Sequence, residues 1–243
     1  MQDRKHHAAS RIASRLAWQC GLLLVAMAVH GAAQAHGISG GDAAFVARNQ
    51  GAQIVPFLYL GAKHMVTGYD HLLFILGVIF FLYRLSHVAL YVTMFSIGHS
   101  ITLLTGVLGG IHVNPYLIDA IIGLSVVYKA FDNLGGFQTV FGVQPNAKVA
   151  VLGFGLVHGF GLATKLQDLN PSKDGLVANM VSFNVGVEIG QLIALTLMLA
   201  LILVWRRSVG FGRYAVAANV LILCAGFGLM EYQLAGYFSE RTG

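Results

Sequence analysis

Charged residues are scarce in this chain, and their scarcity argues against an ordinary soluble domain. Only 10% of the 243 residues are Asp, Glu, Lys or Arg, and 56% are hydrophobic. Soluble domains carry about 25% charged residues. The basic residues form no run that would suit a nucleic-acid surface. The composition therefore predicts an integral membrane protein that contacts the lipid bilayer and has no nucleic-acid partner.

Cysteine is nearly absent, which excludes a disulfide framework. Of the two cysteines, Cys20 lies in a predicted leader and Cys224 lies alone in an apolar run. The mature chain would therefore hold no pair to oxidise. Nucleotide-binding motifs are also lacking, so we expect no ATP hydrolysis by this chain.

Residues 1–35 are typical of a secretory signal peptide. Basic residues between Arg4 and Arg15 precede an apolar stretch that begins at Leu16, and Ala33-Gln34-Ala35 has the small-x-small form of a cleavage site. Cleavage would leave His36 at the mature N-terminus, on the far side of the membrane. An uncleaved signal anchor is the alternative.

Six apolar segments follow the leader and predict an all-α, polytopic bundle of about six transmembrane helices. They lie near 66–83, 88–108, 115–131, 148–166, 177–204 and 214–236, and most approach the roughly 20 residues that a crossing needs. Residues 36–65 would then be a short periplasmic segment, 66–236 the membrane domain and 237–243 a periplasmic tail. Lys and Arg in the loops between spans favour one side by six to two. The positive-inside rule therefore predicts the bacterial inner membrane with both termini periplasmic.

Ionisable residues inside these apolar segments are the candidate functional residues, because each costs roughly 2.5–3.5 kcal/mol at a helix centre. They are Asp70, His71, His99, Asp119, His158 and Glu188, with His64 just outside the first segment. No Lys or Arg is expected within reach of Glu188. The carboxylates should then be protonated, paired with a charged imidazole, or bound to a cation that is not part of the chain. At a rise of 1.5 Å per residue, five of the candidates fall in the outer half of the membrane or near its midplane: Asp70, His99, Asp119, His158 and Glu188. This shared depth predicts a ladder of ligands leading inward.

Local spacing supports this interpretation. His64 and His71 are two helical turns apart and would share a face. The segments "GLVHG" (155–159) and "GVEIG" (186–190) are Gly-x-x-x-Gly motifs, which let helix backbones approach closely. A faint echo links "FSIGHSITL" (95–103) and "FGLVHGFGL" (154–162), in which Phe is followed by His four residues later.

Each feature also has a structural interpretation that the sequence leaves open. His99 and His158 could be packed histidines bonded to a neighbouring carbonyl. Asn184, Glu188 and Gln191 line one stripe and could form an interhelical hydrogen-bond network.

Five segments together resemble the HupE/UreJ family of bacterial membrane proteins, which is associated with nickel uptake for hydrogenase and urease. They are "HMVTGYDHLLF", "FSIGHSITLL", "IDAIIGLSVVYKAFDN", "FGLVHGFGLA" and "FNVGVEIGQL", within about residues 60–195. The resemblance implies metal roles for His64, Asp70, His71, His99, His158 and Glu188. Asp119 departs from it, because the family would have Glu there, one methylene longer.

The leading hypothesis is thus an inner-membrane permease, not an enzyme, with Ni²⁺ as its transported substrate and no tightly bound cofactor. Co²⁺ and Zn²⁺ fit the same imidazole and carboxylate ligands, and a homo-oligomer is compatible with this function. The alternatives are a membrane-embedded metalloenzyme that uses the same cluster, a haem carrier with His71 and His158 as axial ligands, and a proton-coupled carrier without metal.

Overall fold

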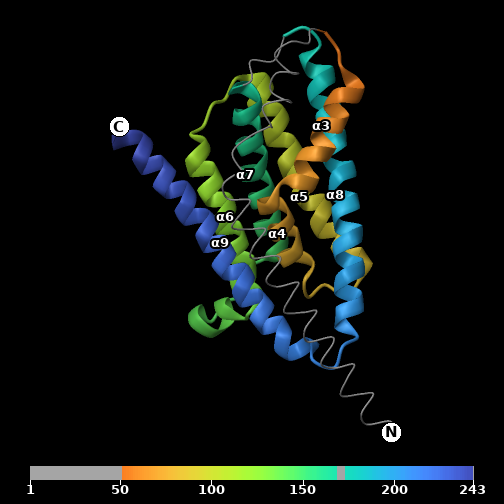
Figure 1. Cartoon of the computed structure of the whole chain (residues 1–243), viewed down its shortest axis with the longest axis vertical. Helices are drawn as coiled ribbons and strands as arrows, with labels where there is room; N and C mark the ends of the chain where they lie inside the picture. Colours follow the sequence, from red (N-terminus) through yellow and green to blue (C-terminus); the bar gives the residue numbers. More distant parts are fainter. Residues whose placement is uncertain (1–50, 169–172, 243) are drawn as a thin grey trace.

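The computed structural model describes residues 51–168 and 173–242, and in these ranges it contains helices and no strands (Figure 1). The predicted all-α bundle is therefore confirmed. The helices are α3 (Ile54–Thr67), α4 (Tyr69–Ile79), α5 (Leu85–Gly109), α6 (Pro115–Asn133), α7 (Ala147–Asp168), α8 (Leu176–Arg206), α9 (Phe211–Thr242) and the short π-helix η1 (Phe137–Phe141). The predicted signal peptide lies outside the described residues.

Four helices, α5, α7, α8 and α9, are long and apolar enough to cross a membrane. Their bounds lie close to those of the predicted segments. Helix α6 has 19 residues and carries Asp119, Lys129 and Asp132, and the first predicted crossing is divided between α3 and α4. The number of six crossings therefore stays a prediction.

The first crossing differs most from the expectation, because its helix begins at Ile54 and breaks at Gly68. Residues 54–65, which we expected in a short periplasmic segment, belong to α3 and pack along α8. Phe57, Leu60, Gly61 and Met65 are buried at the spacing of one helical face. At Gly68 the backbone is extended, with φ −75° and ψ 97°, and its N–H donates to the carbonyl of His64 at 2.8 Å.

Three helix pairs form the framework: α3 with α8, α5 with α7, and α6 with α9. Glycine lies at every one of these contacts. A Cβ on Gly190 would lie 2.6 Å from the carbonyl oxygen of Ala62 in α3, and one on Gly98 would lie 2.5 Å from that of Leu152 in α7. In the third pair, a Cβ on Gly123 would lie 2.7 Å from the backbone nitrogen of Met230. The close approach predicted for the Gly-x-x-x-Gly motifs is therefore confirmed, and a larger side chain would separate the backbones.

Helix α4 lies among these pairs, with contacts to α3, α5, α6, α8 and α9. Its last turn is held by Arg206 of α8, which donates to the carbonyls of Ile79, Phe80 and Leu82 at 3.0, 2.6 and 2.8 Å. The α4–α5, α6–α7 and α8–α9 connections lie at one end of the bundle (Figure 1). We call this end the α4 C-terminal end; α5 and α7 both start there and run in the same direction.

Candidate metal site

Four histidines from four helices form a cluster with His71 at its centre, near the break between α3 and α4. The ring centre of His71 lies 4.8 Å from that of His158, 5.3 Å from that of His64 and 6.0 Å from that of His99. His71, His99 and His158 are buried. Two imidazoles that share one metal through bonds of about 2.0–2.1 Å have their ring centres roughly 5 Å apart. The spacing is therefore of the scale that a shared ion requires.

Each of these histidines keeps one buried ring nitrogen without a hydrogen-bond partner. These atoms are Nε2 of His64, His71 and His99, and Nδ1 of His158. Buried polar atoms nearly always have a partner, and water is not at hand inside a bilayer to provide one. Four such nitrogens within one cluster are unusual for packing alone, and neutral imidazole is a ligand for Ni²⁺, Co²⁺ and Zn²⁺.

Asp70 orients the central histidine. Its Oδ1 lies 2.9 Å from Nδ1 of His71 and also accepts the backbone N–H of His71 at 2.8 Å. A carboxylate cannot donate, so Nδ1 of His71 carries the proton and Nε2 holds the lone pair. This is the carboxylate–histidine arrangement that fixes the tautomer of metal-ligating histidines. The contact assigns Asp70 an orienting position beside the cluster.

Ser125 of α6 fixes the tautomer of His158 in the same way. Its hydroxyl donates to the carbonyl of Ile122 at 2.6 Å, so its oxygen is left to accept at the 3.2 Å contact with Nε2 of His158. The proton of His158 must then lie on Nε2, which leaves the lone pair on the buried Nδ1. Two independent contacts thus leave ligand atoms, not donors, inside the cluster.

Asp119 has a counter-charge built into the chain, contrary to the expectation that the carboxylates in the spans lack one. Lys165 of α7 lies 2.9 Å from its Oδ1 and 2.8 Å from its Oδ2. The two side chains are 6% and 18% exposed, so the pair is largely shielded from solvent. An ion pair across helices explains how α6 carries this charge; a metal role for Asp119 stays a prediction.

Glu188 does not share the buried space of the histidines, because its side chain is exposed on α8. Its neighbours on the predicted stripe, Asn184 and Gln191, form the interhelical hydrogen bonds of the structural alternative. Asn184 donates to the hydroxyl of Ser100 at 2.7 Å, and Gln191 accepts from Ser96 at 3.2 Å. The stripe therefore joins α8 to α5, and the predicted ladder does not continue from the histidines to Glu188.

The histidines lie close together, but their ligand nitrogens do not converge on a single position for a metal ion. Among the described residues, no three His, Cys, Asp or Glu side chains already stand in a geometry that would hold one ion. The structure thus shows four nearby donors, two of them with a fixed tautomer, and no finished coordination shell. Sequence reasoning found all four histidines and missed Ser125 and Lys165; the position of Lys165, two turns after His158, was the available signal.

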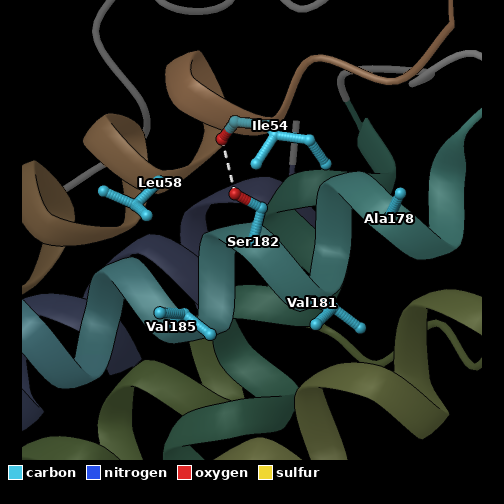
Figure 2. Close-up of a pocket in the computed structure, with 6 residues that line it drawn as sticks. All are labelled: Ile54, Leu58, Ala178, Val181, Ser182 and Val185. Atoms are coloured by element: carbon cyan, nitrogen blue, oxygen red, sulfur yellow. Dashed lines mark hydrogen bonds between the residues drawn. The ribbon is translucent and has the colours of Figure 1, made fainter.

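A groove on the surface of the α3–α8 pair offers no comparable chemistry (Figure 2). Its lining is apolar apart from Ser182, whose hydroxyl donates to the carbonyl of Ile54 at 2.5 Å. Leu58, Val181 and Val185 face the same space (Figure 2). A groove without a free polar group cannot hold a metal ion, and the candidate site remains the histidine cluster.

The apolar helices and the buried imidazole nitrogens together fit a membrane metal transporter. A family model described as HupE / UreJ protein matches residues 41–241, and the chain belongs to this family. The resemblance noted from the sequence is therefore confirmed. No curated protein and no solved structure matches the chain.

Proposed function

We propose that this protein carries a divalent transition metal, with Ni²⁺ as the leading substrate, across the bacterial inner membrane through the four-histidine cluster. The observation that carries the proposal is the set of four buried imidazole nitrogens without partners around His71. Neutral nitrogen ligands suit Ni²⁺ better than Mg²⁺ or Ca²⁺, which prefer oxygen. Nickel uptake, the role associated with the HupE/UreJ resemblance, agrees with this ligand set.

The incomplete geometry suits transport better than tight storage. Transport requires ligands that bind the ion and also release it, so several partial contacts serve it better than one closed tetrahedral site. Helix α3 and helix α4 meet at an interrupted backbone beside the cluster, as in transporters whose binding sites lie at broken helices. The ion would replace its water with imidazole nitrogens at this break.

The orientation that we propose has six crossings, counting α3 and α4 as one, with the α4 C-terminal end in the cytoplasm. Six basic residues lie at that end: Arg84, Lys129, Lys148, Arg206, Arg207 and Arg213. At the other end Lys165 and Lys173 are joined by Arg241, and Lys63 lies in the half of the first crossing toward that end. The bias is then six to four and still favours the cytoplasmic side. Lys129 pairs with Asp132 at 2.5 Å, which, together with the Asp119–Lys165 pair, lowers the cost of placing α6 in the membrane.

The test is Ni²⁺ influx into liposomes that contain the purified full chain, followed with a metal-sensitive dye inside. We expect His71→Ala to abolish influx, because His71 contacts the other three rings. His99→Ala should lower it strongly, whereas His87→Ala, an exposed histidine at the start of the same helix, should leave it unchanged. Equal influx by His71→Ala and wild-type protein would refute the proposal.

Metal retention separates this function from that of a metalloenzyme. A permease should lose Ni²⁺ to a chelator within the time of a dialysis, because its ligands must release the ion. One equivalent of metal that resists the chelator would instead support a resident catalytic centre.

A further inference from the structure

The echo between α5 and α7 places a phenylalanine one turn before a histidine on each helix. Phe95 precedes His99, and Phe154 precedes His158. Because both helices start at the α4 C-terminal end, each phenylalanine lies about 6 Å nearer that end than its histidine. Helix α4 runs the opposite way, and there Phe74 follows His71 by three residues. On all three helices, phenylalanine therefore lies on the same side of the histidine.

Phe74 packs against both Phe95 and Phe154, and the three rings form a layer. The ring centre of Phe74 lies 5.3 Å from that of Phe95 and 5.8 Å from that of Phe154. Phe74 and Phe95 are 1% and 2% exposed, and Phe154 is partly buried. Phe154 also lies 5.1 Å from the ring of Tyr128, so the aromatic surface continues onto α6.

The layer lies directly against the histidines. His158 has Phe95 at 5.1 Å and Phe74 at 5.4 Å between ring centres. Phe95 also lies 6.1 Å from His99 and 6.3 Å from His71. An ion held by these imidazoles would therefore meet phenylalanine rings at once on its way to the α4 C-terminal end.

The two sides of the histidine cluster differ in chemistry. Asp70 lies beside the histidines, and the Asp119–Lys165 pair brings charge from α6 and α7 toward the other end of the bundle. Toward the α4 C-terminal end, the phenylalanine layer continues into a buried apolar core that includes Val78, Val126 and Val151. Polar groups follow beyond the rings: Asn133 donates to the carbonyl of Gly77, three residues after Phe74, at 2.8 Å, and Lys129 pairs with Asp132. The rings therefore lie between the histidines and these polar groups.

We propose that Phe74, Phe95 and Phe154 form a hydrophobic seal that stops ions and water at the histidine cluster. Narrow apolar constrictions block ions because they exclude the water that a charge needs. The inference rests on the proposed function and adds a step to it: the ion waits among the imidazoles until the three rings separate. The repeated Phe-x-x-x-His pattern of α5 and α7 then encodes a ligand together with its barrier.

The test is a polar substitution in the layer, Phe95→Asn, with Phe80→Asn as the matched control. Phe80 is the C-cap residue that follows α4 and is equally buried, at 2% exposure. Its ring neighbours Phe81, Trp205 and Phe211 lie at the end of α4. Each variant of the full chain is placed in liposomes, and influx of protons and of Ni²⁺ is recorded with dyes inside. Ni²⁺ affinity is measured on the same preparation in detergent.

We expect Phe95→Asn to raise proton influx and Ni²⁺ influx by about tenfold or more over Phe80→Asn, while Ni²⁺ affinity stays within about threefold of wild type. Proton and Ni²⁺ rates equal to those of Phe80→Asn would overturn the seal. If Phe95→Asn loses Ni²⁺ binding altogether, Phe154→Asn takes its place, because its partly buried ring is less costly to replace.

Failure of the seal and failure of the proposed function give different results. A wild-type protein that neither binds nor admits Ni²⁺ contradicts the proposed function. Proton influx in Phe95→Asn relative to Phe80→Asn still decides the seal in that case, because protons do not require the imidazoles to be metal ligands.

Discussion

Replacing Asp70 tests how the central histidine is oriented. Its Oδ1 accepts Nδ1–H of His71 at 2.9 Å and the backbone N–H at 2.8 Å. Asp70→Asn keeps an amide oxygen in place, so His71 can retain its tautomer while the negative charge is lost. Asp70→Ala removes the charge and the acceptor, and the ring is then free to rotate or to move its proton to the ligand nitrogen.

The expected loss of Ni²⁺ affinity follows from the role of carboxylates that hydrogen-bond to metal-ligating histidines. Loss of the hydrogen-bond partner of a ligating histidine typically costs 10–100-fold in metal affinity. We assign about tenfold, or ~1.4 kcal/mol, to Asp70→Asn and about 100-fold, or ~2.7 kcal/mol, to Asp70→Ala. The loss of affinity is smaller in Asp70→Asn because only the negative charge is removed. It is larger in Asp70→Ala because the charge and the hydrogen bond that orients His71 are both removed.

The assay is equilibrium binding of Ni²⁺ to the purified full chain in detergent. Asp168→Asn is the matched control, because Asp168 also pairs with a histidine, His112 at 3.3 Å, with both side chains more than half exposed. It should bind as wild type does. Affinity within about twofold of wild type in both Asp70 variants would refute the orienting role. Equal and complete loss in Asp70→Asn and Asp70→Ala would instead make Asp70 a direct ligand.

Three further outcomes follow from the same contacts. Gly68→Ala should weaken Ni²⁺ binding several-fold, because its Cβ would lie 3.2 Å from both Oδ1 of Asp70 and Nδ1 of His71; Gly153→Ala, with open space around its Cβ, should not change it in the same titration. Lys165→Met should lower the free energy of unfolding by about 3 kcal/mol, because it leaves a buried carboxylate unpaired. Asp119→Asn in the same chain should restore most of that loss, and an additive effect in denaturant unfolding would count against the pair. Ni²⁺ should leave the protein reversibly in acid, at a pH below about 5.5, because buried imidazoles gain a proton less readily than exposed ones and bind metal only when neutral; complete loss of binding already above about pH 6.5 would point to exposed histidines as the ligands.

Long apolar stretches predicted five of the helices, since lipid solubility over some 20 residues is a local property of the chain. The α3–α4 region resisted the same reasoning. Tyr59, Lys63 and His64 make α3 look interfacial, but one face of it packs on α8 and another approaches the histidines. A helix that borders a polar site is less apolar than one surrounded by lipid. Its mean hydropathy is therefore too low for α3 to be recognised as part of a crossing.

The proximity of the histidines and Asp70 could be predicted, whereas the surroundings of Asp119 and Glu188 could not. Adjacent residues on a helix point about 100° apart, so Val187 is buried while Glu188 is exposed. Depth alone does not distinguish them. The Asp119–Lys165 pair joins positions 46 residues apart, and its existence depends on how α6 and α7 pack. Roles that depend on the direction of one side chain need the structure.

The most direct test of the central claim is nickel X-ray absorption of the full chain loaded with one equivalent of Ni²⁺. The four-histidine cluster predicts a shell dominated by nitrogen at about 2.1 Å, with the multiple scattering of imidazole rings. In His71→Ala that imidazole signature should fall or disappear together with binding. A shell made of oxygen alone, or an imidazole signal that His71→Ala leaves untouched, would contradict the account.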